Sequence, residues 1–334
     1  MIMEKGQYQI VQLNDYKLDF IILLISILII TVFSNIILII AIKRSHTEEV
    51  MSASKRPNIL MTTISISSLI LIANYCIKCF ILVPIILTFN ELVCLVIESI
   101  TSYIFAISLY VISFTMALIS IDKYYSFVRV FNNPLDKVST NLLIKIIWFT
   151  SSILSLFFLL KSTVIYYDWG TYSIICYNYV NYLRELNENK YFRILYIVIS
   201  FTFQYFIPAV IIFVFSLWTV AHFLRKYFQK KEICSELMIA LKLILIFVLF
   251  IATMTTFHLY ANNGVFIFMY DEQDPCLSFI NNWLQLYMFM LSFTFHPIIY
   301  FGFSRVFWKR FYIHIVQRWR KLGIPIARVE VIQI

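Results

Sequence analysis

Long apolar stretches separated by short polar segments dominate the pattern along the whole chain. Ile, Leu, Phe and Val come in runs, as in IILLISILIITVFSNIILIIAI, without the strict alternation of a transmembrane β-strand. A helix of about 20 apolar residues crosses the hydrocarbon core of a bilayer. The pattern therefore predicts seven membrane-spanning helices. They are expected at about 19–42, 58–87, 94–127, 142–166, 191–224, 236–261 and 279–302.

The composition agrees with this pattern and excludes an ordinary soluble domain. Of the 334 residues, 61% are hydrophobic and only 13% are charged, whereas soluble domains have about 45–50% apolar and about 25% charged residues. We therefore expect an all-α membrane protein with three regions. They are an extracellular tail (1–18), a seven-helix bundle (19–303) and a cytoplasmic end (304–334).

Basic residues are distributed unevenly between the two sets of loops that seven spans create. With the N-terminus outside, the inner loops and tail hold 20 of the 27 Lys and Arg residues but only 7 of the 18 acidic residues. The inner side then carries a formal charge of +13 and the rest of the chain −4. Because Lys and Arg concentrate in cytoplasmic loops, the net charge of +9 predicts orientation. A nucleic-acid partner would require a soluble basic domain, which the sequence lacks.

The last apolar run is followed by a basic segment with helical periodicity, from Ser304 to Lys321. This periodicity predicts an amphipathic helix in the inner headgroup layer. A basic tail without fixed structure is the alternative. The apolar face of the predicted helix comprises Val306, Phe307, Phe311, Ile315 and Trp319.

Five landmarks follow one another along the predicted helices in a characteristic order. They are Asn35, the triplet Asp122-Lys123-Tyr124, Trp148, Pro208 and the segment His296-Pro297-Ile298-Ile299-Tyr300. In this order, across essentially the whole chain, the sequence resembles the rhodopsin-like (class A) G-protein-coupled receptors. The resemblance implies a seven-transmembrane helix bundle followed by an amphipathic helix 8, in the cell membrane.

The stretch ALISIDKYYSFV, residues 117–128, narrows the resemblance. It is most similar to the corresponding stretch of chemokine and related peptide receptors. Heavy use of Ile, Phe and Tyr together with degenerate motifs resembles virus-encoded chemokine-receptor homologues of herpesviruses and poxviruses. The implied partners are an extracellular peptide or chemokine, a heterotrimeric G protein of the Gi type and the lipid bilayer.

Residues for G-protein coupling are implied at the inner ends of the third and fifth spans. In the family, the Asp of the triplet restrains the neighbouring Arg, which on activation extends toward the G protein. Here that Arg is Lys123, a point charge without a planar fork of donors, so we expect weaker restraint and altered coupling. Alternatively, Asp122 and Lys123 are interfacial charges that only fix topology. The coupling set is Asp122, Lys123, Tyr124, Arg225 and Lys226.

Several positions that switch conformation in the family are altered here. Ser68 stands where the family has a sodium-binding Asp, and a hard cation needs carboxylate oxygens, so we expect the sodium site to be lost. His296 replaces an Asn and is expected to be a neutral hydrogen-bonding group, with titration near neutral pH as the alternative. The implied switch residues are Asn35, Ser68, Pro208, His296, Pro297 and Tyr300.

The fifth and sixth spans depart further from the family. Aligned on Phe247, the family's Trp and Pro of the sixth span fall at Ile251 and Thr253. Without the proline there is no kink to act as a pivot for helix motion. Ser216 stands where the family has a Tyr in the fifth span.

The outer ends of the helices carry the residues implied for ligand binding. Lys78 and Glu98 form either a plain ion pair or part of a pocket. Cys94 and Cys176 resemble the family's disulfide, although Cys94 lies 28 residues before Asp122, about one turn too many. The predicted pocket comprises Lys78, Glu98, His258, Trp283, Gln285 and Tyr287.

The alternatives to a signalling receptor are a decoy receptor, a transporter or channel, and an enzyme. A non-signalling decoy or scavenger receptor of the same fold is favoured by the altered triplet, the missing proline and His296. A transporter or channel would show charges at mid-membrane, broken helices and related halves, and the chain has only 5 glycines and no visible repeat. No catalytic, metal or cofactor motif has credible spacing, so we expect neither an enzyme nor a cofactor.

Overall fold

The computed structural model describes the cores of the helices. The described residues are 22–43, 55–77, 91–128, 133–160, 195, 198–230, 244–252, 254–255, 291, 293–294, 297 and 299. They contain helices and short turns, and no strand. Beyond the helix Ile22–Lys43 and the helical residues 244–252 and 254–255, the elements are α2 (Lys55–Cys76), α4 (Glu91–Val128), the 3-10 turn η3 (Pro134–Lys137), α5 (Thr140–Leu160), the π-helical turn η4 (Phe201–Phe206) and α8 (Ile207–Lys230).

Four of these helices are long and apolar enough to cross a bilayer, which indicates a membrane protein. They are Ile22–Lys43, Arg56–Cys76, Ser99–Val128 and Val198–Lys226, and Thr140–Leu156 is a shorter apolar helix. These correspond to the first five predicted spans, so α8 is the fifth span and not the family's helix 8. The tail 1–18 and the terminal region 304–334 lie outside the described residues.

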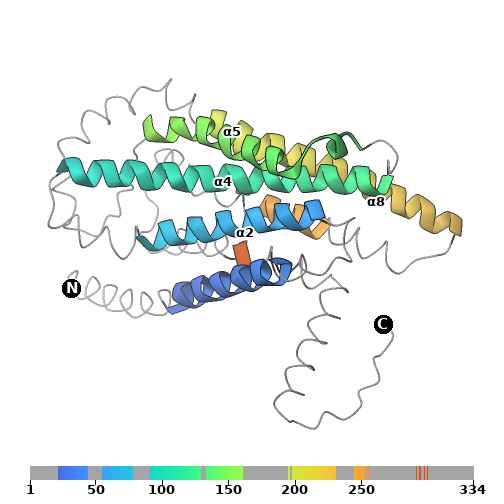
Figure 1. The fold of residues 1–334 in the computed structure, drawn as a ribbon, viewed down its shortest axis with the longest axis horizontal. Coiled ribbons are helices and arrows are strands. Elements are labelled where there is room, and N and C mark those ends of the chain that lie inside the picture. The colour runs from blue at the N-terminus through green and yellow to red at the C-terminus, as the bar shows by residue number, and fades with distance from the viewer. Residues whose placement is uncertain are drawn as a thin grey trace, which may run out of the picture.

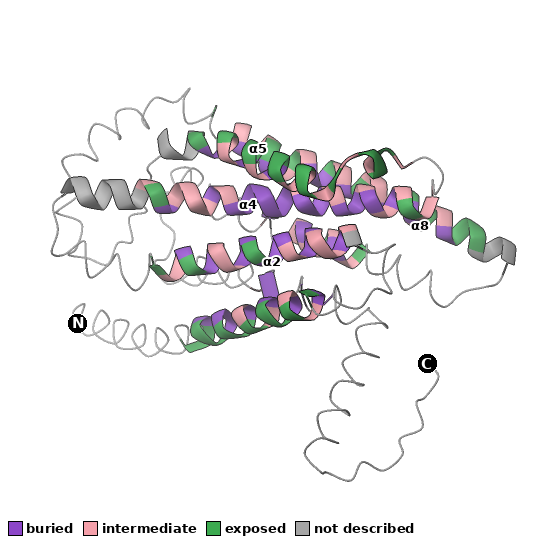
Figure 2. Cartoon of the chain, in the orientation of Figure 1, coloured by how far each residue is buried: buried purple, intermediate pink, exposed green. Residues whose placement is uncertain are grey.

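The longest element, α4, is the centre of the described bundle. Its 38 residues correspond to about 57 Å of helix, and it packs against α2, α5 and α8 (Figure 1). Because neighbours cover it on several sides, its middle is buried around the helix, as the purple ribbon in Figure 2 shows. Ala106, Leu109, Val111 and Ile112 have no exposed surface.

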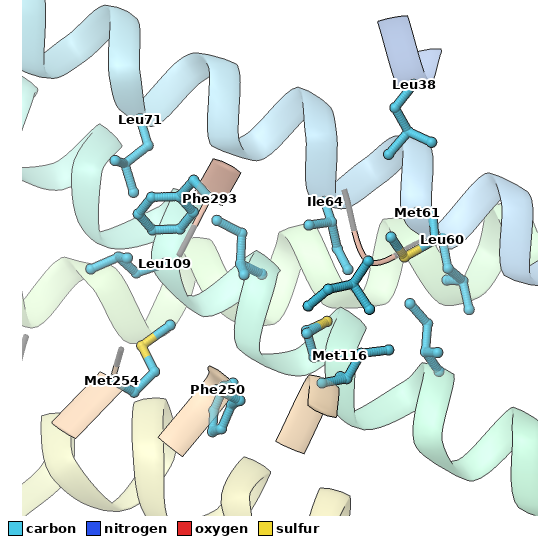
Figure 3. Packing of buried hydrophobic residues seen from close by; sticks show 14 of the residues in the cluster. Leu38, Leu60, Met61, Ile64, Leu71, Leu109, Met116, Phe250, Met254 and Phe293 are labelled. Carbon is cyan, nitrogen blue, oxygen red and sulfur yellow. The ribbon is translucent and has the colours of Figure 1, made fainter. Parts of the chain in front are cut away.

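One apolar core joins α4 to the first helix, to α2, to α8 and to helical residues of the sixth and seventh predicted spans. Leu60, Ile64 and Leu71 of α2 meet Leu109 and Met116 of α4 (Figure 3). The core also includes side chains from segments that are distant in sequence. They include Leu38 from the first helix, Phe250 and Met254 from the helical residues 244–252 and 254–255, and Phe293. Ala209 and Ile212 of α8 also belong to this core.

Exposed residues, green in Figure 2, run along the helices, and many of them are large and apolar. Phe33 in the first helix is 63% exposed, Phe149 in α5 is 68% exposed and Phe213 in α8 is 48% exposed. Large apolar patches of this kind are rare on soluble monomers, but no hydrophobic cost attaches to them in lipid. The exposed faces therefore suit association with a lipid bilayer.

Local sequence explains how the chain turns from α4 into α5. Asn133 caps η3 by accepting a hydrogen bond from the backbone N–H of Leu135 at 3.0 Å, and Pro134 occupies the first turn. Ser139 then caps α5, because its hydroxyl accepts from the N–H of Leu142 at 3.2 Å. Both caps follow the usual preference for Asn and Ser before a helix. They fix the position of Asp136 between the two helices.

A π-helical turn, which the sequence reading did not anticipate, precedes Pro208. Proline has no N–H and its ring crowds the carbonyl four residues earlier. The turn η4 ends at Phe206, two residues before Pro208, and the N–H of Ile207 is bonded to the carbonyl of Thr202. The turn places Gln204 inside the bundle with no exposed surface. The hydroxyl of Tyr205 shares a hydrogen bond of 2.9 Å with Thr255, which ties the fifth span to the sixth.

Candidate functional site

A buried carboxylate lies near the end of α4. Asp122 is 3% exposed, and its Oδ1 accepts a hydrogen bond from Nη1 of Arg56, at 3.0 Å. Arg56 belongs to the first turn of α2, where Pro57 is also tolerated. A carboxylate removed from water is costly unless it is paired and hydrogen-bonded. Arg56 supplies both the opposite charge and the donor.

The same guanidinium also holds the turn between α4 and α5. Nη1 of Arg56 donates to Oδ1 of Asp136 at 3.2 Å, and Nη2 donates to the carbonyl oxygen of Leu135 at 2.8 Å. The planar fork of arginine allows several acceptors to be bound at once. We call this set, Arg56 with Asp122, Leu135 and Asp136, the Arg56 bridge. It joins α2, α4 and η3 through one side chain.

The two carboxylates of the Arg56 bridge differ strongly in exposure. The side chain of Asp122 is 4% exposed and that of Arg56 is 15% exposed, whereas that of Asp136 is 68% exposed. Water screens the outer pair, and exposed ion pairs contribute less than about 1 kcal/mol. The inner pair therefore dominates the energetics of the bridge.

Lys123 lies beside Asp122 in sequence but has a different partner. Its Nζ lies over the ring of Phe127, 5.7 Å from the ring centroid, one turn further along α4. In the part of the chain that the structure describes, the ion pairs of Asp122 and Asp136 both go to Arg56. The described ion pair of Asp122 is therefore made with α2 and not within the triplet.

Tyr124 completes the triplet and belongs to an aromatic cluster between α4 and α8. Its ring is 8% exposed and lies 5.2 Å from Phe215 and 5.5 Å from Trp218, measured between centroids. Phe127 and Phe223 add a second contact between the same helices, at 5.5 Å. Arg225 and Lys226, both exposed, follow on α8. The structure thus brings Asp122, Lys123 and Tyr124 to one end of the bundle.

A second polar group joins the first helix to residues of the seventh predicted span. Asn35 has no exposed surface, and its Nδ2 donates to the carbonyl oxygens of Thr31, at 2.9 Å, and Phe293, at 3.2 Å. The hydroxyls of Thr31 and Thr294 are also hydrogen-bonded to each other. Pro297, another implied switch residue, is buried nearby in sequence.

Removing the Asn35 amide tests this contact. Asn35→Ala deletes the hydrogen bonds to Thr31 and Phe293 and is expected to lower the free energy of unfolding by about 1 kcal/mol. The measurement is denaturant unfolding of the purified chain in detergent. Ser34→Ala is the matched control, because among the described residues the Ser34 hydroxyl bonds within its own helix, to the carbonyl of Thr31 at 3.0 Å. Equal losses in both variants would contradict the prediction.

The remaining switch positions that the structure describes are Ser68 and Pro208, and it also describes Ser216, which stands where the family has a Tyr. The Ser68 hydroxyl donates to the carbonyl of Ile64 in its own helix at 2.9 Å and has no exposed surface. Ser216 and Pro208 are buried in α8. Among the described residues, no group of three or more His, Cys, Asp or Glu side chains is placed to hold a metal ion.

Most of the predicted ligand pocket lies outside the described residues. The backbone of Cys94 and Glu98 belongs to α4, one turn apart, but their side chains are outside the described part. The disulfide and the ion pair predicted for them therefore stay predictions. The predicted residues outside the described part altogether are Lys78, Cys176, His258, Trp283, Gln285, Tyr287, His296 and Tyr300.

Sequence reasoning missed Arg56 and Asp136 as partners of Asp122 and counted them only as inner-loop charges. A signal was present, because Arg56 follows Lys55 directly before an apolar helix and Asp136 lies in a turn sequence, Asn-Pro-Leu-Asp. Both therefore lie at the same end of the bundle as Asp122 in an up-and-down topology. Their pairing across 66 and 80 residues has no local signature.

Comparison with known proteins adds no assignment: no family model matches the chain, and no curated protein matches it.

Proposed function

We propose that the chain is a seven-helix receptor of the rhodopsin-like kind that signals to a heterotrimeric G protein. The observation that carries the proposal is the Arg56 bridge beside Tyr124. A buried carboxylate at the end of the most buried span is held by charges from another helix and a turn. The same end of α4 contacts α8 through aromatic rings. The Arg56 bridge and the aromatic contacts of Tyr124 thus link the packing of several helices to one membrane surface.

The proposed mechanism is a shift between two packings of the helices. The described packing is the resting one, in which Arg56 holds Asp122 and η3, and Tyr124 packs on α8. A ligand or partner that binds the other packing more tightly shifts the population toward it. In that packing, Lys123, Arg225 and Lys226 are the residues proposed to contact the G protein.

The proposed setting follows the resemblance and the distribution of charge. The N-terminus and the ligand pocket face outward at the cell membrane, and the amphipathic helix 8 lies on the inner surface. The ligand is an extracellular peptide or chemokine, or the receptor acts constitutively, and the transducer is of the Gi type. The concentration of Lys and Arg in the inner loops supports this orientation.

Nucleotide exchange on Gi in membranes that contain the full chain tests the proposal. We expect exchange above that of empty membranes, either basal or with a member of a chemokine panel. We also expect Lys123→Ala to reduce it by tenfold or more (~1.4 kcal/mol). Ser34→Ala is a control for expression and insertion. If neither basal nor ligand-dependent exchange is found with wild-type protein at the cell surface, signalling is rejected.

A decoy receptor of the same fold is the second candidate, and one observation favours it. The aromatic contacts of Tyr124 and Phe127 with Phe215, Trp218 and Phe223 fasten α8 to α4, which opposes movement of α8 away from α4. A decoy would bind and internalise a chemokine without any exchange. Binding measured on the same cells as exchange separates the two candidates.

A further inference from the structure

The start of α5 presents two exposed lysines. Lys137 ends η3, and Lys145 lies in the second turn of α5. Neither forms an ion pair with a described residue, and the adjacent acid, Asp136, is engaged: it accepts hydrogen bonds from Arg56 and from Asn133, each at 3.2 Å. Both lysines are exposed. Together with Arg56, Asp122 and Asp136, they form a group of three positive and two negative charges, so a formal charge of +1 remains at this surface.

Lys145 lies on the face of α5 that points away from the bundle. Leu142, three residues before it, is 50% exposed, and Phe149, four residues after it, is 68% exposed. These spacings place the three side chains on one helix face. Ile147 and Ser151, on the other side of α5, are buried. In a bilayer, the face with Lys145 meets lipid.

The depth of Lys145 is within reach of the headgroup layer. It lies five residues after Thr140, where α5 begins, which is about 7.5 Å along the helix axis. A lysine can lay its apolar stem along neighbouring apolar side chains and place its ammonium group at the interface. An ammonium ion within hydrocarbon is costly, so the side chain is driven toward the headgroups, where phosphates are available.

We propose that Lys137, Leu142, Lys145 and Phe149, which we call the α5 lipid surface, bind the headgroup of an anionic phospholipid. The two ammonium groups bind its phosphate and carboxylate, and its acyl chain lies along Leu142 and Phe149. The complementarity of charge selects an anionic over a zwitterionic headgroup, because each lysine near the bilayer surface attracts an anionic headgroup. The proposal is independent of receptor signalling.

Native mass spectrometry of the full chain, released from micelles doped with phosphatidylserine or phosphatidylcholine, tests the proposal. The wild type is expected to retain phosphatidylserine preferentially. Lys137→Gln and Lys145→Gln are each expected to weaken phosphatidylserine retention about fivefold, with phosphatidylcholine retention unchanged. The double variant Lys137→Arg/Lys145→Arg is expected to keep the preference for phosphatidylserine, because arginine retains the positive charge.

Controls make each outcome decisive. Lys43→Gln removes an exposed lysine at the end of the first helix, away from the α5 lipid surface, and is expected to change retention less than twofold. Thermal unfolding of each variant in detergent confirms that it is folded. Equal retention of both lipids by the wild type overturns the proposal. Full retention of phosphatidylserine by the double variant Lys137→Gln/Lys145→Gln also overturns it. So does an equal loss in Lys43→Gln, or displacement of the lipid by soluble glycerophosphoserine at equal concentration.

Discussion

Replacing Arg56 with methionine is expected to lower the free energy of unfolding by about 3–5 kcal/mol, the cost of leaving a buried charge without its partner. Methionine keeps much of the volume and length of the arginine stem but supplies no charge or donor. Asp122, at 3% exposure, would then lose its ion pair at 3.0 Å. The carbonyl of Leu135 would also lose its donor from Arg56. The measurement is denaturant unfolding of the purified chain in detergent, followed by a helix signal.

Matched variants separate the buried pair from the exposed one. Asp136→Asn removes a charge that is 68% exposed and is expected to cost less than about 1 kcal/mol. The double variant Arg56→Met/Asp122→Asn removes both charges of the buried pair and is expected to recover a large part of the loss, which a double-mutant cycle measures. A loss for Arg56→Met no larger than that for Asp136→Asn would refute the dominance of the buried pair.

The membrane spans could be predicted because the bilayer imposes a length and an apolar surface on each of them. The predicted ranges 58–87, 94–127 and 191–224 locate α2, α4 and α8 correctly, and the deviations have local causes. The helix α2 begins at Lys55, before the apolar run, because Pro57 is compatible with a first turn. The helix α8 continues to Lys230, because a polar helix can extend past the hydrocarbon region.

The candidate site was predicted only in part, because a single sequence does not show which distant residues meet. Asp122 and Tyr124 were singled out because the triplet Asp122-Lys123-Tyr124 resembles the family's Asp-Arg-Tyr at the inner end of the third span. The partner of Asp122 was not recognised, because Arg56 and Asp136 are as consistent with solvated loop charges as with a bridge. The burial of Gln204 was not predicted either. The π-helical turn before Pro208 places the amide of Gln204 in the interior, and no periodicity of the apolar residues indicates such a turn.

Replacing Asp122 with asparagine is expected to raise basal nucleotide exchange on the G protein about tenfold, if the proposed receptor function holds. The substitution keeps the shape of the side chain but replaces a charged acceptor, and hydrogen bonds to charged groups contribute about 1.5–3 kcal/mol. If the Arg56 bridge is made only in the resting packing, the loss of about 1.4 kcal/mol shifts the equilibrium tenfold toward the other packing. The measurement is exchange in membranes with equal receptor amounts.

The controls for Asp122→Asn distinguish release of the bridge from general loosening of the bundle. Tyr205→Phe removes the hydrogen bond between the fifth and sixth spans, away from the bridge, and is expected to leave basal exchange within about twofold, since it removes only a neutral contact of about 1 kcal/mol. The basal exchange of Asp136→Asn is expected to lie between that of Tyr205→Phe and that of Asp122→Asn, because the exposed pair of Asp136 with Arg56 is weak. Exchange that rises equally in Tyr205→Phe, or that falls in Asp122→Asn, would contradict the bridge as a restraint.

If exchange is absent from the wild type but present in Asp122→Asn, the bridge silences a coupling-competent receptor. If it is absent from both while a chemokine still binds, Asp122 serves packing alone and the decoy is the better account.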